Sequence, residues 1–331
     1  MKKKNRWNQK QKVITTVIVL CLIVAIGCVL YGIWKKNQTT VQSGGNIQEV
    51  EDSTTVTYQG KKYKYNRDLK NIVFFGVDKR EAVQVQEYPG RGGQSDAILL
   101  LVMDKEKKTT QMLQVSRDSM VNLKIYDTDG NLLTEKRGQL ALQYAYGDGE
   151  KKSCRLARDA VSELLYGIPI SGYISLNMDG IVSIVDAIGG VPMILKEDYT
   201  YVDPAYEKGT ELVLDGAAAE RFVRYRDIAI TGSNNIRMER QIVFLDALLG
   251  AVKAYMQKAE GYEQLLDSAS PYMVTDLTAE EMKKLSEYQV EEPMQKVPGE
   301  TMEGEEHDEY IVDDAALYEM ILDVFYEKVE K

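Results

Sequence analysis

One uncharged run near the amino end limits what this chain can fold into more than any other feature. Residues 13–34 carry no charged side chain over 22 positions, and a helix of that length, at about 1.5 Å per residue, spans roughly 33 Å and can cross a bilayer. Six basic residues precede the run, and only Lys35 and Lys36 follow it closely. The sequence therefore predicts a single-pass protein of the cell membrane with a cytoplasmic amino end and an extracellular remainder.

The composition of that remainder excludes several classes of function. Residues 1–48 hold eight basic and no acidic side chains, so the net charge of −10 becomes −18 for residues 49–331, which argues against nucleic-acid binding. Cys154 is the one cysteine outside the apolar run, so no intrachain disulfide is expected there. His307 is the only histidine, which argues against a Ser-His-Asp triad and histidine-rich metal sites. We expect a cytoplasmic segment, a membrane helix, a polar stalk and a folded domain at residues 1–12, 13–34, 35–57 and 58–331.

Short apolar runs alternate with helical patterns through the folded domain. A hairpin is expected at residues 57–65, and strands at 71–76, 96–104, 109–118, 173–179 and 191–198. Helices are expected at 153–167, 180–188, 235–258, from Ala279 behind a Thr278/Glu281 capping box, and at 313–329. This order predicts an α/β (α+β) fold with a central mixed β-sheet flanked by helices on both faces.

An arginine-rich stretch at residues 221–241 is the strongest chemical signal. The segment FVRYR is expected to be a short strand that puts Arg224 and Arg226 on one face. In the helix after Ser233, Arg237 and Arg240 are spaced i, i+3 and share a face. Guanidiniums that converge without matching carboxylates indicate a multivalent anion such as pyrophosphate. The alternative is a solvated surface on which these arginines pair with Glu220, Asp227 and Glu239.

Acidic residues lie where the expected strands begin and end. Asp78 closes the first core strand and Asp96 opens the next. Because magnesium takes carboxylate and phosphate oxygens, two such aspartates beside arginines suggest a metal-pyrophosphate site. The alternative is that both are ordinary turn residues. Arg117 and Asp118 end a third strand, either as a local ion pair or as a phosphate ligand with its orienting carboxylate.

These short segments together resemble the LytR-CpsA-Psr family in their order and approximate spacing. The resemblance runs from about Tyr58 to the last helix and rests on NIVFFGVDKR, QSDAILLLVMD, VSRDSMVNL, LQYAYGDGE, LLYGIPISGYISLNMDGIVSIVDAIGGV, LDGAAAERFVRYRD and IRMERQ. It implies that residues 58–331 are a catalytic domain, an extracytoplasmic phosphotransferase. Such enzymes move a glycopolymer, for example teichoic acid or capsular polysaccharide, from an undecaprenyl pyrophosphate carrier to peptidoglycan.

The resemblance also implies roles for individual residues. Asp78 and Asp96 match the ligands of Mg²⁺. The residues around the pyrophosphate are Arg80, Arg117, Arg224, Arg226, Arg237, Arg240 and Gln241, and the catalytic group is Arg117, Asp118, Arg224 and Arg226. Either Asp78 or Asp118 is a candidate to take the proton of the attacking hydroxyl. Gln94 and Asn234 depart from the family pattern, since an arginine and an aspartate are usual there.

A lipid carrier would need an apolar channel. Candidate lining residues are Leu164, Leu165, Ile181, Ile184 and Val185, although ordinary core packing explains the same residues. Two other functions stay open, a polyprenyl-pyrophosphate phosphatase and a non-catalytic wall-binding or regulatory protein. The expected cytoplasmic segment, about a dozen residues, is too short for a DNA-binding domain.

Overall fold

The computed structural model describes residues 55–127, 129–227, 229, 233–258, 260–285, 287–291, 293–304 and 307–329, without the side chains of Asn234 and Asn235. The basic segment, the apolar run and nearly all of the expected stalk lie outside these residues, as does the side chain of Asn234. Within the described ranges, no helix is long and apolar enough to cross a membrane.

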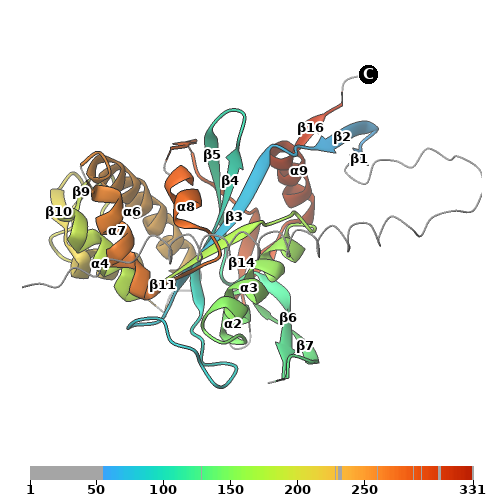
Figure 1. Cartoon of the computed structure of the whole chain (residues 1–331), viewed down its shortest axis with the longest axis horizontal. Helices are drawn as coiled ribbons and strands as arrows, with labels where there is room; N and C mark the ends of the chain where they lie inside the picture. The colour runs from blue at the N-terminus through green and yellow to red at the C-terminus, as the bar shows by residue number, and fades with distance from the viewer. Residues whose placement is uncertain are drawn as a thin grey trace, which may run out of the picture. The chain divides into compact units, whose positions relative to one another are not determined.

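A seven-stranded mixed sheet forms the centre of the fold (Figure 1). Its order is β11 (Met273–Thr275), β8 (Gly172–Asn177), β3 (Leu69–Val77), β4 (Ser95–Asp104), β5 (Thr109–Val115) and β12 (Gln289–Val290), and β13 (Gln295–Lys296) also pairs with β5. The β3–β8 pair and the pairs of β5 with β12 and β13 are parallel. The β3–β4, β4–β5 and β8–β11 pairs are antiparallel.

Helices cover both faces of this sheet, which confirms the predicted fold class (Figure 1). One face carries α2 (Ala141–Ala145), α3 (Lys151–Leu164) and α9 (Asp314–Phe325). The other carries α4 (Met178–Ile188), α5 (Gly216–Arg224), α6 (Ser233–Tyr255) and α7 (Gly261–Ala269), the last followed by the 3-10 turn η1 (Ser270–Tyr272). Helix α8 (Ala279–Leu285) begins with the expected capping box, in which the Glu281 amide donates to Thr278 Oγ1 at 3.2 Å and the Thr278 amide donates to Glu281 Oε2 at 3.0 Å.

The alternation of side chains along β3 separates two apolar regions. Val73, Phe75 and Val77 are fully buried in the core beneath α3 and α9. Phe74 and Gly76 face the opposite side, where they line a cavity. A second buried cluster forms between α4, α5, α6 and the β9 strand (Val191–Ile194). Because successive strand residues point to opposite faces, one strand supplies both the core and the cavity wall.

Smaller sheets extend the domain. The expected hairpin is β1 (Thr55–Tyr58) with β2 (Lys61–Tyr65), and β16 (Tyr326–Lys328) adds a third strand. The predicted helix over 313–329 is therefore too long, since α9 ends at Phe325 and the next residues pair with β2. Three further antiparallel pairs are β6 (Met120–Tyr126) with β7 (Leu132–Gln139), β9 with β10 (Glu211–Leu214), and β14 (Gly299–Glu303) with β15 (Asp308–Val312).

The prediction of a strand at FVRYR is wrong. Its first residues are the last turn of α5, which begins where the Asp215 side chain accepts a hydrogen bond from the Ala218 amide at 2.8 Å. Three alanines follow this cap and favour a helix. The helix ends before Tyr225, whose backbone is extended at φ −51° and ψ 131°. Arg224 is thus a helix residue and Arg226 a loop residue.

Candidate active site

A β-bulge places the first acidic group. Gly76 pairs with Ala97 and Val77 pairs with Ser95, so Asp96 is an extra residue in β4. A bulge turns the extra side chain out of the regular alternation. Asp78 follows the end of β3, and its amide donates to the Gln94 carbonyl at 2.9 Å. The two aspartates therefore lie at neighbouring positions on β3 and β4, as the sequence predicts.

The Asp96 carboxylate holds two guanidiniums. Its Oδ1 accepts from Arg117, which follows β5, and its Oδ2 lies 3.4 Å from Nη1 of Arg237 on α6. Arg117 also donates to Gln94 Oε1 at 2.5 Å. Burial lowers the pKa of Arg237, against the opposing effect of Asp96, but a guanidinium stays charged at neutral pH. Gln94 thus acts as a neutral acceptor for Arg117.

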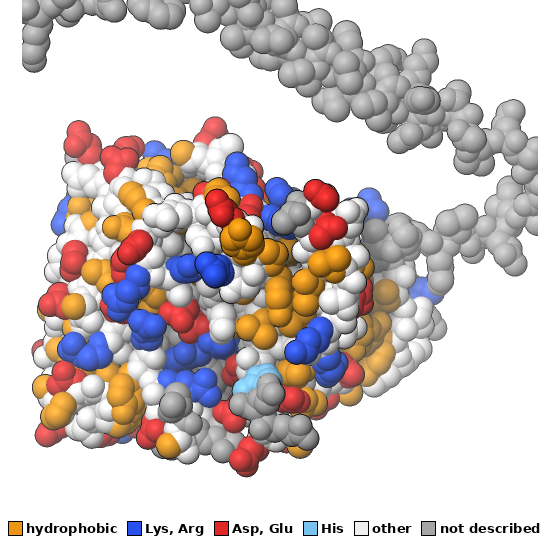
Figure 2. Space-filling model, turned by 90° about the horizontal axis from the view of Figure 1, so that it is seen from below, with side chains coloured by type: hydrophobic (Ala, Val, Ile, Leu, Met, Phe, Trp, Pro, Cys, Tyr) orange, Lys and Arg blue, Asp and Glu red, His pale blue; other side chains and the backbone are white. Residues whose placement is uncertain are grey.

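A second group of charges lies at the end of α5. Arg224 Nη2 is 3.0 Å from Asp78 Oδ1, and its Nη1 is 3.4 Å from Glu220 Oε1. Glu220 also pairs with Arg80, whose Nη1 lies 3.6 Å from Asp179. Glu220 is one helical turn before Arg224, so the carboxylate holds the Arg80 and Arg224 guanidiniums side by side. In Figure 2, Lys and Arg side chains gather among Asp and Glu side chains near the middle of one face.

Arg226 is held by partners distant in the sequence. Its Nε donates to Ser233 Oγ at 2.9 Å, and its Nη2 lies 3.4 Å from Asp308 Oδ2. Asp308 begins β15, so the carboxyl-terminal part of the chain helps to fix this arginine.

Arg240 does not point where the sequence analysis expects. Its side chain is 1% exposed, and it donates to the carbonyl oxygens of Phe222 and Tyr225 and, at 3.3 Å, to the hydroxyl of Tyr201. These carbonyls lie at and just beyond the end of α5, where the last turn leaves acceptors without helical donors. Arg240 therefore fixes the α5 end that carries Arg224, and its donors are used within the protein.

Asp118 is buried behind Arg117. It is 2% exposed, its Oδ1 lies 3.3 Å from Arg117 Nε, and it accepts from Gln139 Nε2 at 2.9 Å. Burial raises the pKa of Asp118, and the nearby Arg117 opposes this increase. These contacts match the expected orienting carboxylate.

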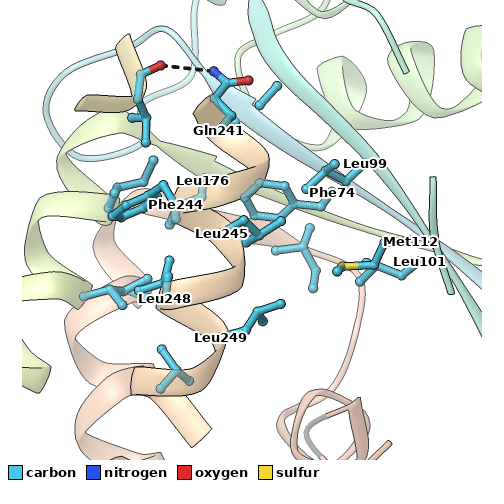
Figure 3. A pocket seen from close by; sticks show the side chains of 18 of the residues that line it. Phe74, Leu99, Leu101, Met112, Leu176, Gln241, Phe244, Leu245, Leu248 and Leu249 are labelled. Atoms are coloured by element: carbon cyan, nitrogen blue, oxygen red, sulfur yellow. Dashed lines mark hydrogen bonds between the residues drawn. The ribbon is translucent and has the colours of Figure 1, made fainter. Parts of the chain in front are cut away.

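An apolar cavity of about 420 Å³ opens beside these charges. Phe74, Leu99, Leu101 and Met112 of the sheet form one wall, and Phe244, Leu245, Leu248 and Leu249 of α6 lie opposite (Figure 3). At the polar end are Asp96, Arg224, Arg237 and Gln241. Gln241 donates to the Val223 carbonyl at 3.3 Å, and its buried Oε1 has no hydrogen-bond partner among the described residues.

The residues expected to line a lipid channel are divided between this cavity and the core. Ile181 and Ile184 of α4 line the cavity. Leu165 is fully buried in the core on the other face of the sheet, and Leu164 packs against that core. Val185 belongs to the buried cluster between α4 and α5. Leu164, Leu165 and Val185 are thus core residues, and the cavity wall of α6 was not predicted.

Three acidic side chains of the site were also not predicted as functional. Glu220 had a local signal, since it lies four residues before Arg224 in a helix-forming segment, but it was expected only as part of a solvated surface. Asp179 and Asp308 had none, because each reaches its arginine only through the tertiary fold.

The two aspartates at the neighbouring ends of β3 and β4 are the candidate ligands for a magnesium ion. Among the described residues, no group of three or more His, Cys, Asp or Glu side chains is arranged to hold a metal. Asp78 and Asp96 supply two carboxylates at neighbouring positions. Magnesium is commonly bound by one or two carboxylates together with phosphate oxygens and water, so this donor set fits the ion when a phosphate completes it.

Comparison with known proteins shows which family the sequence matches. A model of the LytR_cpsA_psr family matches residues 30–325. The chain is 27% identical over 276 residues to the polyisoprenyl-teichoic acid–peptidoglycan teichoic acid transferase TagU of Enterococcus faecalis, over 82% of this chain and 79% of the relative.

Two solved structures show the same fold. A Streptococcus agalactiae protein superposes with a TM-score of 0.62 at 20% identity, over 80% of this chain and 91% of that one. TagT bound to LI-WTA superposes with a TM-score of 0.57 at 21% identity, over 78% and 90%.

Proposed function

The chain belongs to the LytR-CpsA-Psr family, and on that basis we propose that it is an extracytoplasmic phosphotransferase of the cell wall. Its substrate is a glycopolymer, such as teichoic acid or another wall polysaccharide, carried on undecaprenyl pyrophosphate. Its product is the glycopolymer joined to peptidoglycan by a phosphodiester. The relative from Enterococcus faecalis is named for a transfer of this kind.

One observation carries the proposal: the apolar cavity ends at a cluster of arginines. A long apolar tail would fill the space between the sheet and α6, and its pyrophosphate would then lie at Arg224 and Arg237. A ligand that matches both regions must be an amphiphile with a compact anionic head. Polyprenyl pyrophosphates have this shape and charge.

The protein's own groups would stabilise the transfer electrostatically. Attack by a sugar hydroxyl adds negative charge to the equatorial and leaving oxygens, and fixed guanidiniums of Arg117, Arg224 and Arg237 offer donors for it. Asp78 and Asp96 would hold Mg²⁺, which supplies Lewis-acid stabilisation of the phosphate oxygens. Asp118 is buried against Gln139, so we assign it the positioning of Arg117. Asp78 is the more exposed candidate for the hydroxyl proton.

We further propose that the apolar run 13–34 anchors the protein in the membrane, with the catalytic domain outside. The charge distribution around the run supports this orientation. An anchor would keep the site near a lipid-held donor.

The test combines purified full-length protein, a lipid-linked glycopolymer, peptidoglycan and Mg²⁺. We expect phosphodiester-linked glycan on the peptidoglycan, and loss of the product when a chelator removes the metal. Release of free glycan phosphate would show a phosphatase instead. Binding of the donor without any turnover would show a non-catalytic module.

A further inference from the structure

Two exposed tyrosines form a rigid aromatic surface at the end of α5, the helix that carries Arg224. Tyr201 is 44% exposed and Tyr225 is 37% exposed. Their ring centroids are 5.9 Å apart with an interplanar angle of 52°. We call this pair the tyrosine platform. Aromatic faces left open to solvent beside a charged site point to a ligand with an apolar surface of similar size.

The Arg240 side chain fixes the tyrosine platform. The Arg240 guanidinium carbon lies 5.7 Å from the ring centroid of Tyr201 and 6.0 Å from that of Tyr225. The same guanidinium donates to the Tyr201 hydroxyl and to the Tyr225 carbonyl. Tyr201 also packs edge-on against Tyr199, with ring centroids 6.2 Å apart. Both rings therefore hold their positions before a ligand arrives, which lowers the entropic cost of binding.

Polar groups border the platform. Arg221 lies one helical turn before Tyr225, and its Nη2 is 3.3 Å from Asp203 Oδ2. Both side chains are partly exposed, so their remaining donor and acceptor positions face solvent. An aromatic face with hydrogen-bonding groups at its edge suits a pyranose ring, which presents C–H groups on its faces and hydroxyls around its rim.

We propose that the tyrosine platform binds the sugar that is attached directly to the donor pyrophosphate. This assignment rests on the proposed function and adds a glycan subsite to it. Tyr225 directly follows Arg224 and precedes Arg226 in the chain, so the platform includes a residue bonded to two of those that would hold the phosphates. The lipid would extend from the pyrophosphate into the cavity. The first sugar, on the other phosphate, must then lie outside the cavity and within one sugar length of the guanidiniums.

The experiment compares two ligands on purified full-length protein in the presence of Mg²⁺. One is farnesyl pyrophosphate, and the other is the same lipid pyrophosphate carrying one N-acetylhexosamine. We expect the sugar to strengthen binding by about five- to tenfold, as stacking on aromatic rings would. Tyr201→Ala and Tyr225→Ala should each remove most of this gain and change the binding of farnesyl pyrophosphate less than about twofold. NMR of the bound sugar should show its ring protons shifted upfield by the aromatic faces.

Two controls separate stacking from structural effects. Tyr201→Phe removes the hydroxyl that accepts from Arg240 but keeps the ring, so the sugar gain should persist. Tyr166 is another exposed tyrosine, 52% exposed, that packs on Tyr318 with ring centroids 5.5 Å apart, and Tyr166→Ala should leave both affinities unchanged. Persistence of the gain in Tyr225→Ala, with an unaltered melting temperature, would overturn the assignment.

The possible results also distinguish this assignment from the proposed function. Equal binding of the two ligands by the wild-type protein would overturn the tyrosine platform alone. Failure to bind either ligand would overturn the proposed function and the platform with it. Upfield shifts on a soluble peptidoglycan fragment, without any on the donor sugar, would assign the platform to the acceptor and overturn our choice of occupant.

Discussion

Replacement of Arg240 tests whether this residue binds the substrate or fixes the helix end that does. Arg240→Met keeps most of the apolar volume but leaves the carbonyls of Phe222 and Tyr225 without their donor. A hydrogen bond to a charged group contributes about 1.5–3 kcal/mol. For two such bonds from a fully buried side chain, we expect a loss of about 3–5 kcal/mol in the free energy of unfolding. That loss is a large part of the stability of a typical domain.

The assay is denaturant unfolding of the full-length variants, followed by titration with inorganic pyrophosphate in the presence of Mg²⁺ under conditions in which each variant is folded. Arg240→Lys is the informative companion. Its ammonium presents all three donors from one nitrogen, so it cannot take the separate Nε and Nη2 positions from which Arg240 reaches the two carbonyls. If Arg240 positions the end of α5, lysine should restore little of the lost stability. A lysine or methionine variant with wild-type stability but weaker pyrophosphate binding would refute this reasoning. It would show that Arg240 binds the pyrophosphate directly.

Three further perturbations probe the cavity, the metal and the buried acid. Leu248→Trp should fill part of the cavity and weaken polyprenyl pyrophosphate binding about tenfold or more, with inorganic pyrophosphate unaffected; an equal loss for both in competition titrations would contradict a lipid channel. Asp78→Ala should abolish transfer and weaken the dependence of pyrophosphate binding on magnesium, measured by metal titration, and an unchanged metal response would exclude this residue as a ligand. Burial raises the pKa of Asp118 above its ordinary 3.8. The folded protein therefore binds the carboxyl proton more tightly than the unfolded chain does. Stability should fall as pH rises from 3.8 through the raised pKa. Asp118→Asn should lack that fall when the free energy of unfolding is measured between about pH 3.5 and 7, and identical pH profiles would show that the burial of Asp118 is not the cause.

The central strands could be predicted because their apolar pattern is local and strong. The runs that became β3 and β4 are continuous and β-rich, and their ends place Asp78 and Asp96 at neighbouring positions. The prediction of a strand at FVRYR failed because its aromatic and β-branched residues favour a strand, whereas the Asp215 cap and three alanines upstream start a helix. Local propensity cannot decide such a segment when a cap several residues away determines its state.

The contacts of individual side chains were harder to predict than the helices and strands. The sequence correctly predicted that one helix holds Arg237 and Arg240, and their spacing put them on a shared face. Arg237 nevertheless reaches Asp96, while Arg240 reaches the α5 carbonyls. Periodicity gave Leu165 an apolar helix face but not the side of the sheet on which that helix packs. Phe244 and Leu245 form the cavity wall on α6, but sequence does not distinguish a residue that lines a cavity from one that fills a core.

The carboxylates around the arginines change the net charge of the candidate site. The sequence left open whether the guanidiniums lack matching acids or pair with nearby ones such as Glu220. In the structure Arg80, Arg117, Arg224, Arg226 and Arg237 each contact a carboxylate. The acids in these contacts are Asp78, Asp96, Asp118, Asp179, Glu220 and Asp308. With every group ionised, six acids and five guanidiniums give the cluster a formal charge of −1.

A cluster with that charge does not favour a bare pyrophosphate. Partly exposed ion pairs such as Arg224 with Asp78 contribute little each, so they can be exchanged for charge-assisted bonds to phosphate oxygens. A divalent cation at Asp78 and Asp96 would bring the charge to about +1 and release the donors of Arg224 and Arg237 toward the anion. The anion and the cation should therefore bind cooperatively, each strengthening the affinity for the other by the same factor. On this reasoning the acids of the site orient the guanidiniums, and they also make the binding of a diphosphate depend on its metal.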